Sequence, residues 1–390
     1  MKKLLIVNNN MKIGGVQKSL YNLLWSVSDQ YEITLFLFAP VGEYMSDLPE
    51  QVQVLSCDSL FRYLGVGQRE CAKDLRDRLT RGLLACICKL FGRRAVMPLL
   101  LRSQKQLAAH YDCAISYLHN GDSHHFYGGV NEFVLEKTDA TQKVAFLHCD
   151  YLQCGANCEE NNKAYRAFDL IAACSDGCRR SFVQALPELA QKCVTVPNFH
   201  RYGKIRELSQ QTPYCYPAGA LHVVMVGRLA HEKGIDRALR ALACVRGQGI
   251  AAILHLVGSG PMEKELRKLV YAQKLSSAVV FHGEQNDPYR FMLNADLLLM
   301  TSWHEAAPMV IDEACALSLP VLTVKTTSSD ELVSARGCGW ACENEQAALN
   351  TALTALLKAP ERIQAVRARL SQANFGNERA EAAFAALIGR

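Results

Sequence analysis

The chain has 390 residues, of which 49% are hydrophobic and 21% charged, and its formal net charge is +5. This length exceeds the roughly 100–200 residues of a single domain, so we expect two domains, each with its own core. The composition is that of a globular protein and excludes a disordered or fibrous one. No apolar run approaches the roughly 18–20 residues of a spanning helix, and the apolar start at 4–7 runs into three asparagines, too soon for a signal peptide.

Sixteen cysteines are scattered along the chain. Because no export signal is visible, we expect reduced, mostly buried thiols in a cytoplasmic protein. Three pairs have three-residue spacers, whereas structural zinc sites usually have tighter spacings, so we expect no metal site. These pairs are Cys154/Cys158, Cys174/Cys178 and Cys338/Cys342.

In chain order, short apolar runs with β-strand character alternate with longer helical patterns, which is typical of parallel sheets covered by helices. In the first half the predicted strands are 4–7, 33–38, 52–55, 113–116, 143–147 and 170–173; in the second half they are 221–226, 253–257, 279–282, 297–300 and 320–324. Turn-forming residues without a period at 203–219 predict a linker. The pattern therefore predicts an α/β protein of two tandem Rossmann-like, doubly wound domains, with a ligand cleft where their strand ends face each other.

The segment 61–105 is strongly basic, with eleven basic residues against three acidic ones, interleaved with leucines. A basic amphipathic segment suits the surface of an anionic membrane. A solvated helical face packed on the N-terminal domain explains the same pattern equally well. We expect no nucleic-acid partner, since no recognised motif is present.

Two cations follow the predicted strand 221–226. Arg228 offers a planar fork of donors and Lys233 a compact charge, a pair suited to a diphosphate. A surface loop with local ion pairs is the alternative.

Two glutamates, Glu305 and Glu313, follow the predicted strand 297–300. Pro308 predicts the start of a helix. The backbone N–H groups around it would point at an anion, with help from the helix dipole. This anion-binding segment consists of Ala306, Ala307, Pro308, Met309 and Val310. The two acids would accept hydrogen bonds from sugar and ribose hydroxyls, since unpaired buried acids are rare.

Other candidate positions also follow predicted strands. Gly14 and Gly15 would let the backbone approach a phosphate or sugar, and Gly258 repeats this arrangement in the second half. A glycine pair alone is a weak signal. His148 places an imidazole at the carboxyl end of the strand 143–147.

Together these residues resemble a large family. Gly-Arg-Leu-x-x-Glu-Lys-Gly, Val-Gly-x-Gly-Pro, Val-Pro-Asn and Glu-x-Ala-Pro with a second Glu are similar to the motifs of retaining glycosyltransferases of group 1 (family 4-like). That family has the two-domain GT-B fold and includes bacterial sucrose, lipopolysaccharide and capsule enzymes. The resemblance is strongest over 194–331, and 326–333 with 339–344 further resemble capsule and exopolysaccharide enzymes. Ser318 stands where many members carry glycine, and Ser328-Ser329 replaces a commoner glycine pair.

The resemblance implies a role for each candidate residue. Arg228 and Lys233 would neutralise the donor diphosphate, and Glu305 would contact the donor sugar. The backbone amides of 306–310 would bind the distal phosphate of the donor. Glu313 would hold the ribose. The remaining expected donor contacts are His148 beside the sugar, Gly15 near the phosphates, Glu284 and Asn286 near the base, and the glycines Gly14 and Gly258. The expected catalytic set is His148, Arg228, Lys233 and Glu305.

The resemblance also implies retaining transfer of a hexose or N-acetylhexosamine from a nucleotide-diphosphate sugar, UDP preferred, without a metal or cofactor. The acceptor would be a saccharide or a polyprenyl-diphosphate-linked saccharide at the inner face of the cell membrane. Residues 1–202 would bind the acceptor and 203–372 the donor, with 373–390 a helix packing back on the N-terminal domain. A catalytically silent sugar-nucleotide-binding subunit of a partner transferase, and a nucleotide-sugar epimerase or a phosphorylase of similar shape, remain alternatives.

Overall fold

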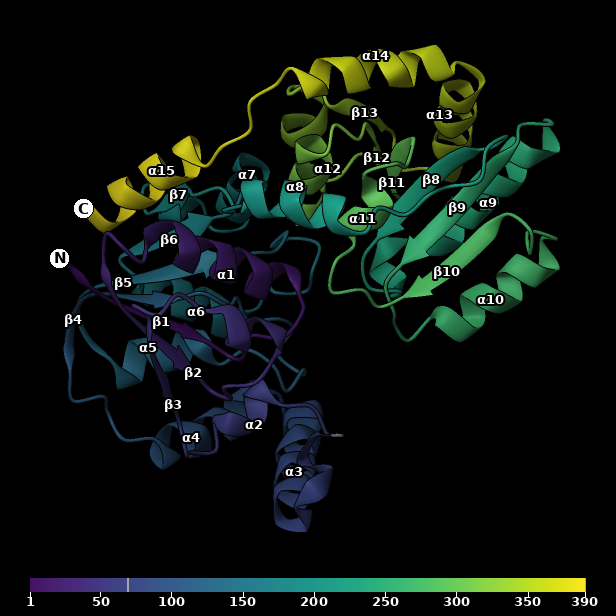
Figure 1. The fold of residues 1–390 in the computed structure, drawn as a ribbon. Helices are drawn as coiled ribbons and strands as arrows, with labels where there is room; N and C mark the ends of the chain where they lie inside the picture. The colour runs from purple at the N-terminus through teal and green to yellow at the C-terminus, as the bar shows by residue number, and fades with distance from the viewer. Residues whose placement is uncertain (69, 390) are drawn as a thin grey trace. The chain divides into compact units, whose positions relative to one another are not determined.

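The computed structural model describes residues 1–68 and 70–389 (Figure 1). Arg69 of the basic segment lies outside the described residues, as does the side chain of Lys73. The chain divides into two compact units, Met1–Phe199 with Asn377–Arg390, and His200–Gly376. In the described part of the chain, no helix combines the length and apolarity needed to cross a bilayer.

The first unit is built on a seven-stranded parallel sheet with the order β3-β2-β1-β4-β5-β6-β7. Its strands are β1 (Lys3–Asn8), β2 (Glu32–Leu37), β3 (Gln53–Ser56), β4 (His110–Ser116), β5 (Asp139–Leu147), β6 (Leu170–Ala173) and β7 (Cys193–Thr195). Its helices are α1 (Gly15–Val27), η1 (Glu43–Asp47), α2 (Arg62–Gly65), η2 (Glu70–Lys73), α3 (Leu75–Phe91), α4 (Arg93–Ser103), α5 (Val130–Lys137), α6 (Glu159–Ala167), α7 (Asp176–Ala185), η3 (Pro187–Leu189) and α15 (Glu378–Gly389). Central strands such as β1 are apolar on both faces because helices cover both sides of the sheet.

The second unit repeats this design with a six-stranded parallel sheet of order β10-β9-β8-β11-β12-β13. Its strands are β8 (Leu221–Val226), β9 (Ala252–Val257), β10 (Val279–Gly283), β11 (Leu297–Met300), β12 (Val321–Val324) and β13 (Gly339–Cys342). Its helices are α8 (Tyr202–Gln211), η4 (His231–Lys233), α9 (Ile235–Gly247), α10 (Glu263–Ala272), α11 (Tyr289–Met292), α12 (Met309–Ala316), η5 (Asp330–Ser334), α13 (Gln346–Lys358) and α14 (Pro360–Ser371).

The predicted fold class, two doubly wound parallel-sheet units, is confirmed. Every predicted strand overlaps an observed one, whereas β7 and β13 were missed; both are short edge strands that are only partly buried. The prediction of an irregular linker at 203–219 was wrong for its first part, which lies in helix α8. There Ile205 is buried in the core of the second unit, and Leu208 packs against it, so burial stabilises a helix whose sequence has little apolar character.

Helix α15 completes the first unit from the far end of the chain. Phe384, Leu387 and Ile388 are at most 3% exposed and share a core with Leu4 of β1. The ring of Phe384 lies 5.8 Å from that of Tyr31. One wall of the first unit's core is therefore supplied by a segment that follows the whole second unit in sequence.

Helix α12 ends in a Schellman motif, although its C′ residue is not glycine. Ser318 adopts φ 56°. The Leu319 N–H donates to the Ala314 carbonyl (2.8 Å) and the Ser318 N–H donates to that of Cys315 (3.0 Å). The end of α10 has the same motif, with Lys274 at φ 56°. A side chain in this left-handed conformation costs about 1 kcal/mol relative to glycine.

Ser318→Gly is therefore expected to raise the free energy of unfolding of the second unit by about 1 kcal/mol. Urea titration in a Trp25→Phe background, followed by the fluorescence of Trp303 and Trp340, measures this change. Lys274→Gly should act in the same direction, whereas Ala272→Gly, at the last residue of α10, should destabilise because glycine has a lower helix propensity than alanine. An equal decrease in the free energy of unfolding in all three variants would contradict the backbone strain at Ser318.

Candidate functional site

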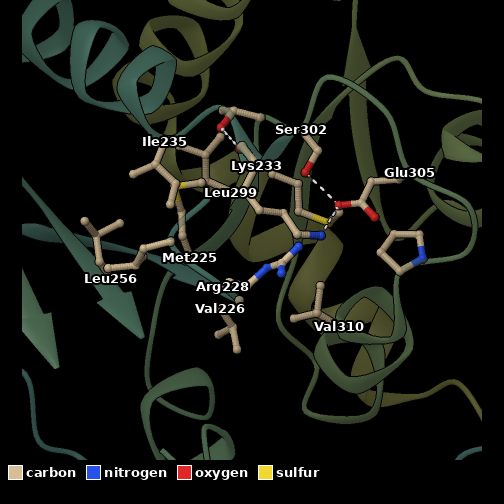
Figure 2. A pocket seen from close by; sticks show the side chains of 15 residues that line it. Met225, Val226, Arg228, Lys233, Ile235, Leu256, Leu299, Ser302, Glu305 and Val310 are labelled. Carbon is tan, nitrogen blue, oxygen red and sulfur yellow. Dashed lines mark hydrogen bonds and ion pairs between the residues drawn. The ribbon is translucent and has the colours of Figure 1, made fainter. Parts of the chain in front are cut away.

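The order of strands in the second unit reverses at β8. Strands β9 and β10 lie on one side of it and β11, β12 and β13 on the other, so the loops after β8 and β11 leave a crevice at the carboxyl ends of these strands. A small cavity of about 40 Å³ opens there (Figure 2). Its lining includes Arg228, Lys233, Ser302, Glu305, Pro308 and Val310.

A salt bridge joins the two loops across this crevice. The Lys233 ammonium lies 2.6 Å from Glu305 Oε1, and the Ser302 hydroxyl donates to the same oxygen at 2.7 Å (Figure 2). The Glu305 side chain is only 11% exposed and that of Lys233 32%. Because the carboxylate is held by two donors, it fixes the ammonium group at the mouth of the cavity.

The backbone around Lys233 is also fixed. The Thr301 hydroxyl lies 3.0 Å from the Lys233 carbonyl and 2.8 Å from that of Gly234. Gly234 is left-handed (φ 58°), and a Cβ there would lie 2.2 Å from the Thr301 carbonyl oxygen. Only glycine fits, so the loop after β8 packs backbone to backbone on the end of β11.

Arg228, the other predicted diphosphate ligand, is 70% exposed and forms an ion pair with Glu232 four residues on. It lines the same cavity as Lys233, but its guanidinium is bound locally. The alternative of a loop with a surface ion pair thus describes Arg228 in this structure. Because the Arg228 side chain is largely exposed, packing does not hold the guanidinium in this pairing.

Glycine turns after β8, β9 and β10 form a close-packed floor beside the cavity. A Cβ on Gly258 would lie 2.0 Å from the Gly227 carbonyl oxygen, and the Gly258 N–H donates to the Gly283 carbonyl at 2.7 Å. Ser259 donates to Glu284 at 3.0 Å. Asn286, on the same turn as Glu284, is exposed. The structure therefore brings the predicted base-binding turn next to the Gly258 turn.

Helix α12 begins at Met309 with Pro308 in an extended N-cap conformation, as the proline predicted. Pro308 has no N–H, so the donors of this segment are the neighbouring amides. Glu313, in the second turn, is 2% exposed. The Ser328 hydroxyl donates to the Ala306 carbonyl, which fixes the loop before the helix. The helix thus directs its positive end toward the cavity, which Val310 lines.

The first unit contains the remaining predicted residues, Gly14, Gly15 and His148. Gly15 is the first residue of α1, and a Cβ there would contact nothing within 4 Å, so packing does not require glycine. His148 directly follows β5 and packs on Tyr117, with ring centroids 4.8 Å apart. Burial, with a further contribution from the nearby His119, lowers the pKa of His148 to about 3.

Three residues were missed by the sequence reasoning. Thr301 and Ser302 directly follow the strand before Glu305, which is the signal that could have identified them. His119 follows β4 by a few residues, and burial lowers its pKa to about 4. Within the described chain, buried His119 Nδ1 and His148 Nε2 have no hydrogen-bond partner. Burial thus favours the neutral form of both imidazoles, and each has a buried ring nitrogen whose hydrogen-bonding capacity is unused.

Comparisons with known proteins relate the second unit to a family. Residues 217–374 match the family described as glycosyl transferases group 1. The chain is 32% identical over 152 residues to the putative colanic acid biosynthesis glycosyltransferase WcaL of Escherichia coli (strain K12), covering 37% of each chain. It is 27% identical over 209 residues to a GDP-mannose-dependent alpha-(1-6)-phosphatidylinositol dimannoside mannosyltransferase of Mycobacterium tuberculosis (strain ATCC 25177 / H37Ra), covering 51% of this chain and 53% of that protein.

These alignments span only about a third to a half of the curated relatives. Over the whole chain, the fold is similar to the crystal structure of Anabaena Alr3699/HepE in complex with UDP and glucose. The TM-score is 0.67, the identity 20%, and 100% of both chains are covered. At this identity the likeness establishes the fold. The family match covers β8 to α14 and includes the Lys233–Glu305 salt bridge. Residues 217–374 therefore form a domain of the glycosyl transferases group 1 family.

Proposed function

We propose that the chain is a retaining glycosyltransferase that moves a hexose or an N-acetylhexosamine from a nucleotide-diphosphate sugar to a saccharide or lipid-linked saccharide. The observation that carries the proposal is the Lys233–Glu305–Ser302 arrangement at the carboxyl ends of β8 and β11, inside a glycosyl transferases group 1 domain. A fixed ammonium group at a topological switch point is suited to bind a diphosphate.

In this proposal the reaction depends on the stabilisation of a leaving diphosphate. The bond between the sugar C1 and the phosphate oxygen breaks, and negative charge grows on the diphosphate, where Lys233 and Arg228 would neutralise it. Arg228 would first exchange its pairing with Glu232 for the phosphate. The amides at the start of α12 would bind the distal phosphate, and Glu313 the ribose hydroxyls.

Retention of configuration would follow from attack on the face that the diphosphate leaves. The acceptor oxygen bonds to C1 while its proton passes to the departing phosphate oxygen, so no carboxylate nucleophile is needed. Glu305, already bound by Lys233 and Ser302, would orient the sugar hydroxyls. The neutral imidazole of His148 would contact the sugar by a hydrogen bond, not as a cation. The charges of Arg228 and Lys233 replace those that a divalent ion would supply, and we propose that no metal is required.

UDP is the preferred donor nucleotide, with the turn containing Glu284 and Asn286 contacting the base. A structural neighbour was solved with UDP and glucose, which supports this preference, while a sequence relative is described as GDP-mannose-dependent. The acceptor we propose is a saccharide, or a saccharide linked to polyprenyl diphosphate, at the inner face of the cell membrane. The relative WcaL, described as an enzyme of colanic acid biosynthesis, supports a role in cell-surface polysaccharide synthesis.

Thermal unfolding with UDP, GDP, ADP and their sugars tests the proposal. A ligand that binds only the folded protein raises the melting temperature, by an amount set by its concentration relative to its Kd. We expect a rise with one nucleotide, UDP first, that is lost in Glu313→Ala and reduced in Arg228→Ala. The rise should persist in EDTA. A shift that disappears in EDTA and returns with magnesium would reject metal independence, and no shift with any nucleotide would reject donor binding.

Binding without turnover defines the competing function. A chain that binds the nucleotide sugar but never consumes it with a lipid-linked saccharide would be a silent subunit of a partner transferase. Conversion of the donor without any acceptor would identify an epimerase.

A further inference from the structure

Helix α3 exposes a row of leucines to solvent. Leu75, Leu79, Leu83 and Leu90 are 67%, 63%, 63% and 65% exposed. Their spacings of four, four and seven residues place them on one face of the helix. Among the described residues, only Met1, Tyr271 and the adjacent Phe91 are large apolar residues with comparable exposure. We call these four leucines the α3 ridge.

The ridge is not the face by which α3 packs on its own unit. That face carries Leu84 and Cys88, which are 5% and 0% exposed. It also carries Asp77, which pairs with Arg62 at 2.6 Å, and Arg81, whose Nε donates to the Val66 carbonyl at 2.8 Å. The helix therefore has two apolar faces, and packing on the first unit buries only one of them.

Both ends of α3 are fixed, so the ridge is presented on a rigid element. The Asp74 side chain caps the first turn by accepting from the Arg76 N–H at 2.8 Å, and the Gly92 N–H donates to the Cys88 carbonyl at 2.8 Å. Figure 1 shows α3 beyond α2 and α4, away from the strands of the first unit.

Cations flank the ridge. Arg76, Arg78 and Lys89 on α3 are exposed, as is Arg94 at the start of α4. In the part of the chain that the structure describes, these four side chains form no ion pair. A second copy of α3 would bring like charges together, whereas an anionic surface would neutralise them. Charge complementarity thus favours anionic lipid as the occupant.

We infer that α3 lies in the surface of an anionic bilayer, with the α3 ridge in the boundary between headgroups and acyl chains and with Arg76, Arg78 and Lys89 at the lipid phosphates. Buried apolar area and attraction to anionic headgroups are the two contributions that hold such a helix at an interface. The inference identifies the membrane-contact surface within 61–105 and goes beyond the proposed function, because it concerns binding and requires no sugar transfer.

Flotation with vesicles tests this surface in the full chain. We expect binding to phosphatidylcholine vesicles that contain phosphatidylglycerol, weaker binding at high salt, and little binding to phosphatidylcholine alone. Leu79→Gln with Leu83→Gln keeps helix propensity and should lower the partition coefficient about tenfold or more. Arg78→Gln with Lys89→Gln should lower it about tenfold or more at low salt, with a smaller effect at high salt.

Matched controls lie on α10 of the second unit. Tyr271→Gln removes a more exposed apolar side chain (82%), and Lys264→Gln with Lys268→Gln removes two exposed cations; neither should change partitioning. Unchanged melting temperatures would show that the α3 variants are folded.

Vesicle binding that the leucine variant leaves unchanged, or no binding to either kind of vesicle, would overturn the inference. If the wild-type protein sediments as a dimer and the leucine variant as a monomer, the ridge would instead be an interface with a second copy of the chain. Vesicle binding without glycosyl transfer would leave the inference intact and reject the proposed enzyme.

Discussion

Replacing Lys233 with methionine is expected to weaken the binding of the nucleoside diphosphate about tenfold or more and to lower kcat/KM for transfer by about 10²–10³. The ammonium is held 2.6 Å from Glu305 at the mouth of the cavity, so its charge is positioned before the donor arrives. Charge that grows on the leaving diphosphate would be stabilised without any rearrangement of this group. Isothermal titration and initial rates with the nucleotide found by thermal unfolding measure the two effects.

The same substitution also leaves Glu305, which is 11% exposed, without its cation, so part of the loss could come from a less stable protein. Lys233→Met with Glu305→Gln removes the uncompensated charge, and Ser302 can still donate to the amide oxygen. We expect this double variant to recover the melting temperature but not transfer. Lys264→Met, on the exposed side of α10, is the control for the loss of one positive charge. Transfer within a few-fold of the wild-type rate in the folded Lys233→Met protein would remove Lys233 from the mechanism.

Gly258→Ala is expected to destabilise the second unit by about 3 kcal/mol or more. Its φ is +144°, and a Cβ there would lie 2.0 Å from the Gly227 carbonyl oxygen and 2.9 Å from its carbonyl carbon. Both contacts are with backbone, so no side chain can turn away to relieve them. The ends of β8 and β9 would have to separate, and the floor beside the cavity would be lost.

Two other glycines isolate the steric effect. Gly249 has φ +79° but open space around its Cβ position, so Gly249→Ala should cost only about 1 kcal/mol. Gly247, the last residue of α9, also has open space, and Gly247→Ala should be neutral or stabilising. In a Trp25→Phe background the remaining tryptophans, Trp303 and Trp340, both report the second unit in urea unfolding. An equal decrease in the free energy of unfolding in Gly249→Ala and Gly258→Ala would contradict the proposed backbone collision.

The sequence was sufficient to predict the fold class because the strands at the centre of both sheets are buried on both faces. Their continuous apolar runs leave a clear pattern, as in β8, whose predicted bounds are those observed. Edge strands such as β13 lack this pattern, since they are only partly buried. Helix α8 was missed because its stability depends on the burial of Ile205 in the core. The helix propensity of the local sequence does not reveal this tertiary contact.

The predicted site was only partly accessible to the same reasoning. Residue type and position after a strand were enough to select Lys233 and Glu305. The bond between them joins loops more than seventy residues apart, and it depends on the strand order that places β8 beside β11. The supporting residues Thr301 and Ser302 act through hydrogen bonds, and threonine and serine are too common for residue type alone to predict such bonds. The neutral state of His148 follows from burial against Tyr117 and from nearby His119, neither of which is visible in its sequence neighbourhood.

The place of α15 in the first unit bears on how the protein is synthesised. The sheet of that unit is complete once Thr195 has left the ribosome, but Phe384 and Ile388 follow nearly two hundred residues later. At translation rates of about 5–20 residues per second, this delay is roughly 10–40 s. During it, the apolar groups that contact α15 stay uncovered while the whole second unit is made. The nascent first unit should therefore be a client of chaperones until translation has passed the last helix.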